Sequence, residues 1–137
     1  MIVLPSIDIL DGRNVRLING DYGREIAYER DPVATAVAYR EAGAEWIHVV
    51  DLDAAKTGDL RNLDVVREVC ATFGGGVEVG GGVRSREAAL RLLDAGASRV
   101  VMGTVLVRHP DLAARLFAEL GERVVAGIDA KNGRVAA

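Results

Sequence analysis

The sequence has little cysteine and few aromatic residues. Its 137 residues include one cysteine, Cys70, and aromatic side chains make up 4% of the chain. A single cysteine excludes a disulfide within the chain and is typical of a reducing cytosol, so we expect a cytoplasmic protein. Cys70 lies in an apolar helical pattern, which predicts a buried structural thiol rather than a nucleophile. The scarcity of aromatic rings argues against a surface on which nucleic-acid bases stack.

The sequence also lacks an excess of basic charge and long apolar runs. The formal net charge is −3, so the basic surface of a nucleic-acid-binding protein is missing. No apolar run approaches the ~20 residues of a membrane span. The opening MIVLPSIDIL has no basic region and reaches Asp8 early, unlike a signal peptide. We therefore expect no nucleic-acid partner and no membrane partner. His48, His109 and Cys70 are widely separated, so no metal site is expected.

Apolar segments rich in β-forming residues alternate with helical patterns along the chain. The predicted strands are IVLPSID (2–8), WIHVVDLD (46–53), GVEVG (76–80), SRVVMG (98–103) and RVVAGIDA (123–130). The predicted helices are VATAVAYREAGA (33–44), NLDVVREVCATF (62–73), SREAALRLLDAGA (85–97) and PDLAARLFAELG (110–121). Residues 12–30, GRNVRLINGDYGREIAYER, are polar and interrupted by glycines, which predicts a long loop.

The predicted helices carry recognisable end signals. Asp31 followed by Pro32 is typical of an N-cap with proline at the first helical position. The other predicted N-caps are Asn62 and Ser85, and the predicted helix stops are Gly43, Gly74 and Gly96.

The alternation predicts an α/β fold with a parallel sheet, because strands and helices of this length form βαβ units. These units and a fifth strand fit an open doubly wound sheet or a parallel (βα)4 half-barrel plus strand five, the N-terminal half of a TIM-barrel fold. A whole barrel needs about 200–250 residues. The single unit expected over residues 1–137 is therefore at most part of one. WIHVV and RVVMG are almost continuously apolar, which predicts cover on both sheet faces.

Acids and glycines fall at the carboxyl ends of the predicted strands. Asp8, Asp51 and Asp129 end the first, second and fifth strands, while Gly80–Gly82 and Gly103-Thr104 follow the third and fourth. Parallel α/β folds bind their ligands at this edge. The sequence therefore predicts a functional site where these acids and glycines meet.

The two glycine turns allow two interpretations. Backbone amides in Gly80–Gly82, followed by the helix cap Ser85, form an anion site, and Gly103 with the Thr104 hydroxyl extends it. Alternatively, both are tight turns without a ligand. Neither matches a Walker loop or a dinucleotide fingerprint. Gly74–Gly76 leads from a helix into a strand, so we expect a helix stop and loop at the opposite edge.

The strand-end acids can act as general acid or base once burial tunes their pKa. In a closed barrel Asp8 and Asp129 would face each other across the pocket. Capping or ion pairing is the alternative for each acid, and Asp51 could equally support a neighbouring site residue. His48, inside the second strand, either lines the site or packs in the core. His109, before a proline, is expected on the surface at a helix start.

Several motifs, in order, resemble those of the ProFAR isomerase family of histidine biosynthesis, a group of phosphate-binding (βα)8 barrels. They are PSIDILDGRNVRLINGDYG, IHVVDLDAAKTG, VEVGGGVRS, VVMGT and GIDAKNGRVA. The resemblance covers the whole chain but only the N-terminal half of the family's fold. It implies an Amadori rearrangement of a phosphorylated ribotide, an aldose–ketose isomerisation without metal or redox cofactor.

The resemblance also implies roles for residues. Asp8 would be the general base at the sugar C2, and Asp129 the general acid that opens the ribose ring. One substrate phosphate would bind Gly81, Gly82, Gly103 and Thr104. Arg16, His48, Asp51 and Arg84 match motif positions close to the site. NGDYGRE (19–25) matches a flexible loop that closes over the substrate.

Three alternatives stay open. The cyclase subunit of imidazole glycerol phosphate synthase shares the fold and a GIDAK-like motif, although its Cys-Leu-Asp stands where this chain has Ser6-Ile7-Asp8. Some related isomerases also accept the tryptophan-pathway ribotide. The chain could also be a non-catalytic phosphate-binding half-barrel. The family's second phosphate site lies in the other half. Because an isolated half-barrel leaves edge strands and a large apolar surface open, we expect the chain to pair with a complementary half-barrel or with itself.

Overall fold

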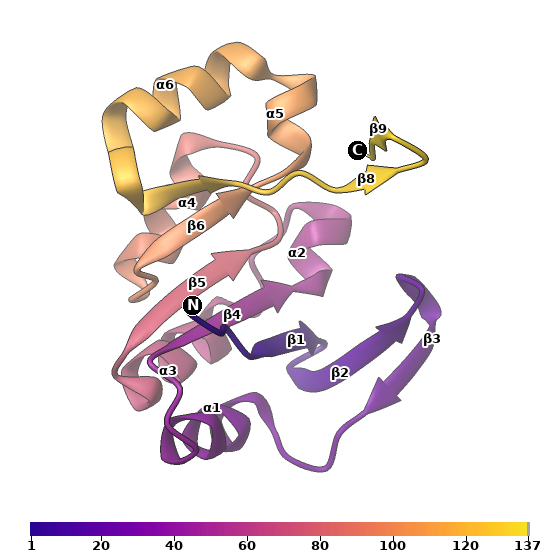
Figure 1. The fold of residues 1–137 in the computed structure, drawn as a ribbon, viewed down its shortest axis with the longest axis vertical. Helices are drawn as coiled ribbons and strands as arrows, with labels where there is room; N and C mark the ends of the chain where they lie inside the picture. Colours follow the sequence, from indigo (N-terminus) through magenta and orange to yellow (C-terminus); the bar gives the residue numbers. More distant parts are fainter. Residues whose placement is uncertain (137) are drawn as a thin grey trace.

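The central feature of the fold is a mostly parallel sheet (Figure 1). A computed structural model describes residues 1–136, and seven strands in this range form one sheet in the order β3-β2-β1-β4-β5-β6-β7. The parallel strands are β1 (Ser6–Leu10), β4 (Trp46–Asp51), β5 (Gly76–Gly80), β6 (Arg99–Met102) and β7 (Val124–Ala126). The predicted α/β class is confirmed, and the topology is consistent with part of a TIM barrel.

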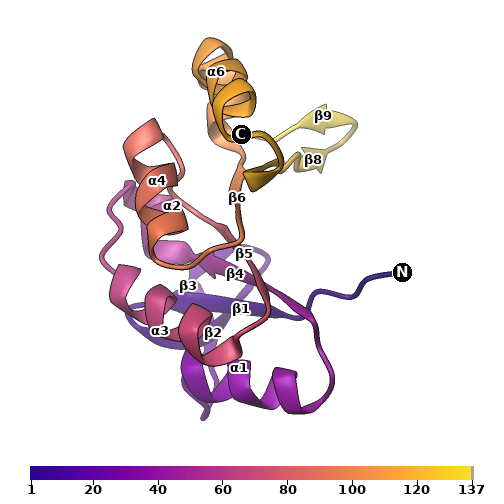
Figure 2. The ribbon, with the colours of Figure 1, turned by 90° about the vertical axis from the view of Figure 1, so that its left-hand side faces the viewer.

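The helices lie in the connections between successive parallel strands. They are α1 (Pro32–Glu41), α2 (Leu52–Thr57), α3 (Leu63–Phe73), α4 (Arg86–Asp94), α5 (Thr104–Arg108), α6 (Pro110–Leu120) and the short 3-10 helix η1 (Gly121–Arg123). Figure 2 shows α3 and α4 on one side of the strands, whereas the N-terminus projects from the other side. The sheet therefore has a helix-covered face and an open face.

The core lies between the sheet and its helices. Alternate strand residues point into it, and none of the following is more than 1% exposed: Ile7, Ile9, Ile47, Val49, Val77, Val79, Val100 and Met102. Burying each such side chain contributes about 1.5–3 kcal/mol. Residues between them, such as Val50 and Val101, are only half-buried. Within residues 1–136 the continuously apolar strands are thus covered on one face, not on both as predicted.

Most predicted helix ends are confirmed. The Asp31 carboxylate accepts a hydrogen bond from the Ala34 amide at 2.7 Å, with Pro32 at the first position of α1. Ser85 caps α4 by accepting from the Ala88 amide at 3.1 Å. Asn62 occupies the predicted N-cap position of α3, although its side chain makes no capping hydrogen bond.

Cys70 is buried in α3, as predicted. Burial raises the pKa of its thiol to about 11, which favours the protonated form at neutral pH, as expected of a structural cysteine.

The loop predicted over residues 12–30 is wrong, because most of this segment is a β-hairpin. β2 (Arg13–Ile18) pairs antiparallel with β1 and with β3 (Asp21–Ala27). Asp11-Gly12 and Asn19-Gly20 form the two turns, and all four residues have φ between 51° and 72°. Asp-Gly and Asn-Gly favour this conformation in two-residue hairpins. Both dipeptides are visible in the sequence, but the polarity of the segment favoured a loop.

Three predicted strand boundaries also differ. β1 begins at Ser6 rather than Ile2, because its pairing with β4 begins there, and Met1–Val3 lie exposed. β4 ends at Asp51, which caps the unpredicted helix α2. β7 ends at Ala126, after which the chain turns into a separate hairpin of β8 (Ala130–Lys131) and β9 (Arg134–Val135). Asp129 therefore lies beyond its strand rather than at its end.

Candidate functional site

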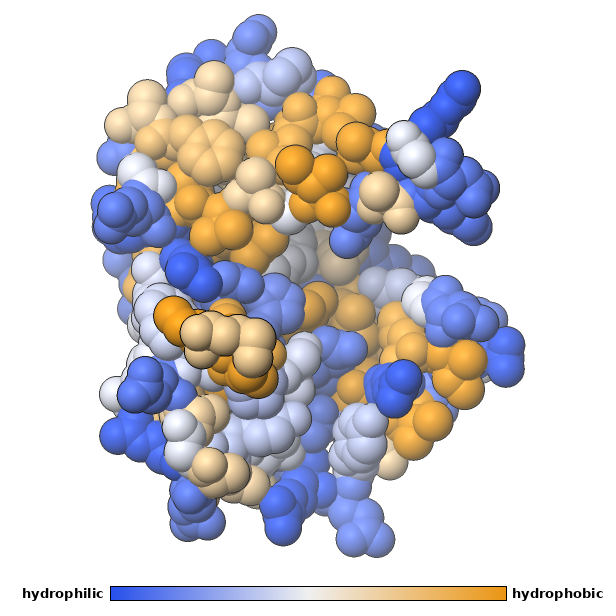
Figure 3. Space-filling model, in the orientation of Figure 1, coloured by the Kyte–Doolittle hydropathy of each residue, from blue (hydrophilic) through white to orange (hydrophobic). Residues whose placement is uncertain are grey.

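The carboxyl ends of β4 to β7 surround a cavity of about 440 Å³. Its lining includes His48, Gly81, Gly103 and Asp129, four of the predicted site residues. Figure 3 shows the molecular surface notched between the β8–β9 hairpin and the β2–β3 hairpin, on the side where these strands end. The structure thus brings together residues that are up to 81 positions apart in the sequence.

Other predicted site residues lie around this cavity rather than in it. Thr104 lines an adjoining cavity of about 200 Å³ together with Gly103 and Asp129. Asp8 and Arg16 line a third cavity, of about 650 Å³, between β1, β2 and α1. The two acids expected to face each other across one pocket therefore line different cavities in this chain.

The glycines after β5 are required by the backbone. Gly81 and Gly82 have φ of 99° and 73°, and a Cβ at Gly81 would lie 2.2 Å from the Asp51 carbonyl oxygen. A Cβ at Gly82 would lie 2.6 Å from the Ala54 Cβ. The turn is therefore pressed against the first turn of α2, which alone explains the glycines.

The same turn keeps free amides. Within residues 1–136, the amides of Gly81, Gly82 and Gly103 donate none of the hydrogen bonds made by the loops. Unpaired backbone amides beside a cavity are suited to an anion. The glycines can therefore form a tight turn and also offer their amides to an anion.

Arg84 and Asp51 serve to hold α2. The Arg84 guanidinium donates to the Ala55 carbonyl oxygen at 2.8 Å, near the end of that helix. The Asp51 carboxylate, 1% exposed, accepts from the Ala54 amide at 3.0 Å and from Asn62 Nδ2 at 2.9 Å. Burial raises the pKa of Asp51, although these hydrogen bonds lower it.

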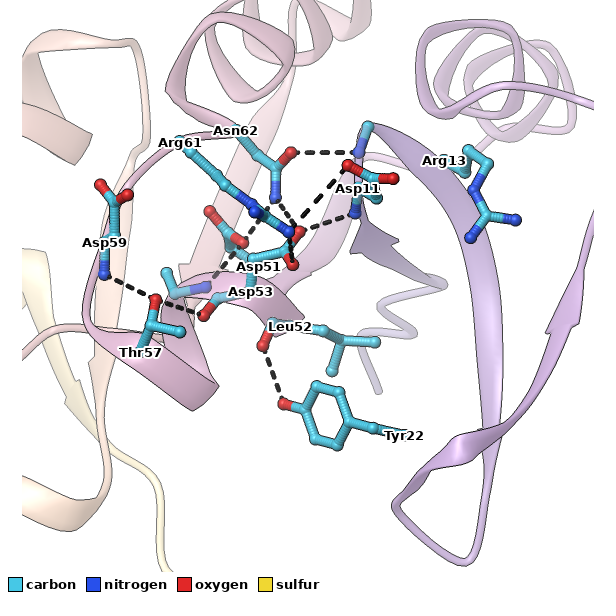
Figure 4. A network of polar contacts seen from close by, with 12 residues as sticks. Asp11, Arg13, Tyr22, Asp51, Leu52, Asp53, Thr57, Asp59, Arg61 and Asn62 are labelled. Carbon is cyan, nitrogen blue, oxygen red and sulfur yellow. Dashed lines mark hydrogen bonds and ion pairs between the residues drawn. The ribbon is translucent and has the colours of Figure 1, made fainter.

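A buried polar network around Asp53 was missed by the sequence analysis (Figure 4). The Asp53 carboxylate accepts from the Asp11 amide at 2.6 Å and from Asn62 Nδ2 at 2.7 Å, and it pairs with Arg61. Burial alone would raise the pKa of Asp53, but these bonds hold it below its usual value. Asn62 Oδ1 also accepts from the Gly12 amide at 3.1 Å. The network fastens the β1–β2 turn to α2, beside the cavity.

Asp8 has the electrostatics of a proton-transfer group. Partial burial raises its pKa, whereas the Ser6 hydroxyl, 3.3 Å from Oδ1, and His48 lower it by a smaller amount. Asp8 lies on the open face of β1, next to the strand that carries His48. A carboxyl group with a raised pKa is better suited to accept a proton near neutral pH.

His48 is half-buried and belongs to the cavity rather than to the core. Its Nδ1 lies 2.6 Å from Glu78 Oε1, and Arg99 Nε donates to Glu78 Oε2 at 2.7 Å. The sequence analysis missed Glu78 and Arg99. Polar residues at alternate positions of otherwise apolar strands are the signal that could have found them.

Within residues 1–136, no group of three or more His, Cys, Asp or Glu side chains is placed to hold a metal ion. In the same range, each helix is too short or too polar to cross a bilayer.

Comparison with known proteins decides the family. A family model described as "Histidine biosynthesis protein" matches residues 2–137. The chain belongs to this family. It is 48% identical over 136 residues to the 1-(5-phosphoribosyl)-5-((5-phosphoribosylamino)methylideneamino)imidazole-4-carboxamide isomerase of Pelotomaculum thermopropionicum, covering 99% of this chain and 52% of the relative. It is 49% identical over 136 residues to the isomerase of the same name from Moorella thermoacetica, covering 99% and 56%.

These matches confirm the resemblance to the ProFAR isomerases. The chain spans about half the length of the curated relatives that it matches, and the match is to their N-terminal part. This family member therefore contains the strand ends described above, whereas the rest of each relative has no counterpart in the chain.

Proposed function

We propose that the chain is the N-terminal half of a ProFAR isomerase and carries the groups that move protons in the Amadori rearrangement. The observation that carries the proposal is the identity of 48% or more to two such isomerases over 99% of the chain. The cavity at the strand ends supports it, because His48, Asp129 and two glycine turns meet there.

The rearrangement needs a proton donor and a proton acceptor. Asp129 would protonate the ribose ring oxygen as the C1–O bond breaks, which leaves an imine between C1 and the amine nitrogen. Asp8 would remove the proton from C2 to form an enaminol. Return of a proton to C1 and loss of the C2 hydroxyl proton then give the ketone. The carbon proton lost at C2 is matched by one gained at C1, so the reaction is redox-neutral.

Phosphate would bind at the glycine turns. The amides of Gly81, Gly82 and Gly103 have no partner in the loops of the described chain, and the Thr104 hydroxyl lies beside Gly103. A phosphate has enough acceptor oxygens to satisfy several such donors. Arg16 lines the Asp8 cavity and would contact the same substrate from the other side.

A second half would complete the site. Val107 on α5, Ile128 after the edge strand β7 and Val135 on β9 are between 54% and 68% exposed. Figure 3 shows apolar atoms around α5. Such a surface fits a complementary half-barrel or a second copy of the chain.

One observation favours a second candidate function, a phosphate-binding half-barrel without catalysis. Asp8 and Asp129 line different cavities rather than opposite sides of one pocket.

Turnover of ProFAR distinguishes the isomerase from the non-catalytic phosphate-binding half-barrel. ProFAR would be supplied to the chain alone and with the carboxyl-terminal half of the Moorella thermoacetica isomerase added. We expect turnover that Asp8→Asn or Asp129→Asn abolishes and that Asp64→Asn, on the outer surface of α3, leaves unchanged. Phosphate binding without turnover in either mixture would establish the binding module instead. Turnover of the tryptophan-pathway ribotide in parallel would reveal dual specificity, and formation of imidazole glycerol phosphate would reveal a cyclase.

Phosphate binding has its own test. Titration with inorganic phosphate should shift the amide resonances of Gly81, Gly82, Gly103 and Thr104 and leave those of Gly74–Gly76 in place. Shifts spread evenly over the chain would contradict a phosphate site at these turns.

A further inference from the structure

A cluster of polar and aromatic side chains lies across the open face of the sheet. It consists of His48 on β4, Glu78 on β5 and Arg99 on β6, which are direct neighbours in the strand register, together with Trp46. We call it the open-face cluster. Its members alternate with buried core residues such as Ile47 and Val77, so they point away from the helices.

Glu78 is the centre of the open-face cluster. One carboxylate oxygen lies 2.6 Å from His48 Nδ1 and the other accepts from Arg99 Nε at 2.7 Å. The Glu78 side chain is 12% exposed, against 30% for His48 and 32% for Arg99. Both carboxylate oxygens are therefore engaged, and the group has little freedom to rotate.

Arg99 is itself fixed. Its guanidinium carbon lies 4.4 Å from the centroid of the Trp46 ring, a favourable cation–π distance. The Trp46 ring lies against Gly76, where a Cβ would come within 2.2 Å of the ring atom Cδ2. Gly76, Trp46 and Arg99 thus form a rigid support behind Glu78.

This support determines which histidine nitrogen is free. An ionised carboxylate can only accept, so Nδ1 of His48 must donate to Glu78 and carry the proton of the neutral ring. Nε2 then has an unprotonated lone pair. Within residues 1–136, Nε2 makes no hydrogen bond and is not among the buried unpartnered atoms, so it remains accessible.

The His48 side chain lies at the cavity. His48 lines it together with Gly81, Gly103 and Asp129. The ring carbon Cε1, which is bonded to both ring nitrogens, would lie 3.9 Å from a Cβ at Gly80, so the imidazole ring lies close to the carboxyl end of β5.

We propose that Glu78, clamped by Arg99, is a positioning residue that holds His48 in the Nδ1–H tautomer and presents Nε2 to a hydroxyl of a phosphorylated sugar bound at the strand ends. The identity of that ligand rests on the function proposed above, whereas the tautomer does not. Glu78 acts through His48 and does not touch the ligand.

The tautomer can be measured directly, because the chain has only two histidines, His48 and His109. Long-range ¹H–¹⁵N spectra at about pH 9, well above the ordinary histidine pKa of about 6.5, distinguish a protonated ring nitrogen from an unprotonated one. We expect His48 to have its proton on Nδ1, while the exposed His109 shows the solution preference for Nε2–H. A native chain with His48 protonated on Nε2 overturns the proposal without any variant.

Two substitutions sharpen the test. Glu78→Gln keeps an oxygen that can accept from Nδ1 and should retain the tautomer, whereas Glu78→Leu removes the acceptor and should return His48 to Nε2–H. His109 should stay unchanged in both. An unchanged tautomer in a folded Glu78→Leu chain contradicts the positioning role. If that variant does not fold, the native spectrum still decides.

The ligand contact has a separate readout. Adding ribose 5-phosphate should shift His48 Nε2 more than inorganic phosphate does, and leave His109 in place. Glu78→Leu should raise the dissociation constant for ribose 5-phosphate about fivefold to tenfold, which corresponds to losing one oriented hydrogen bond. A bound sugar phosphate that leaves Nε2 unmoved overturns the contact. Absence of any binding, with the tautomer as expected, instead counts against the proposed function.

Discussion

The two glycine runs at either end of β5 have the same composition and different neighbours. At the amino end, Gly74 ends α3 in a left-handed conformation, a Cβ at Gly75 would lie 2.7 Å from the Glu45 carbonyl oxygen, and Gly76 makes room for the Trp46 ring. At the carboxyl end, Gly81 and Gly82 are left-handed and lie against the backbone of β4 and α2. A side chain can move away from a new methyl group, but the backbone of a packed strand cannot. Gly81 is therefore less tolerant of a side chain than Gly74 or Gly76.

Gly81→Ala tests this comparison with the largest expected effect. The new Cβ would meet the Asp51 carbonyl oxygen at 2.2 Å, and the residue would also have to keep φ at 99°. Overpacking and left-handed strain together predict a loss of about 3 kcal/mol or more in the free energy of unfolding. Urea denaturation measures it.

Gly12→Ala is the matched control for Gly81→Ala. Gly12 has φ of 72° with nothing within 4 Å of its Cβ position, so only the conformational strain of about 1–2 kcal/mol applies. Equal losses in the two variants would mean that the contact with Asp51 contributes nothing.

The contributions of Asp51 and Asp53 to the free energy of unfolding should change with pH in opposite directions. The pKa of Asp53 is lowered, so its stabilisation is present above the ordinary carboxyl pKa of about 3.9 and is lost as the pH falls below it. The pKa of Asp51 is raised, so the native chain loses stability as the pH rises from about 3.9 towards the raised value.

Asp53→Asn should therefore cost about 2 kcal/mol at neutral pH, because hydrogen bonds to a charged group are lost, and the cost should shrink in acid. The effect of Asp51→Asn should shift in favour of the variant as the pH rises. Urea denaturation from pH 3 to pH 7 follows both, and parallel pH profiles would contradict the two opposite shifts.

Gly76→Ala is expected to cost less than Gly81→Ala. Its Cβ would meet the half-buried Trp46 ring, a side chain rather than the backbone of a strand, so we expect a loss of about 1–2 kcal/mol. Trp46 is the only tryptophan, so its fluorescence reports any displacement of the ring. An unchanged emission spectrum together with a loss of stability would place the strain elsewhere.

The sequence predicted the sheet well because hydrophobic periodicity depends on local spacing. It could not distinguish the two glycine runs by what they contact, since Trp46 and Asp51 approach them from another strand. It placed an acid at the end of β4 but not its burial, which depends on Asn62 and α2. Asn62 has the right residue type for a cap, yet a buried partner competes for its side chain. Long-range contacts of this kind have no local sequence pattern.

Substitutions at Gly74 have the smallest expected effect, and they separate left-handed backbone strain from a steric clash. Gly74 has φ of 68°, and its Cβ would meet the Arg40 guanidinium, with Nη1 at 3.5 Å, an ordinary contact distance. Gly74→Ala should therefore cost about 1 kcal/mol, and Gly74→Asn less, because asparagine tolerates the left-handed conformation. At Gly81 the asparagine Cβ would collide with Asp51 as the alanine Cβ does, so Gly81→Asn should give no such recovery. Urea denaturation of the four variants measures both differences. If asparagine were less destabilising than alanine at both positions, left-handed backbone strain would account for both glycine requirements. The contact of Gly81 with Asp51 would then not distinguish the two positions.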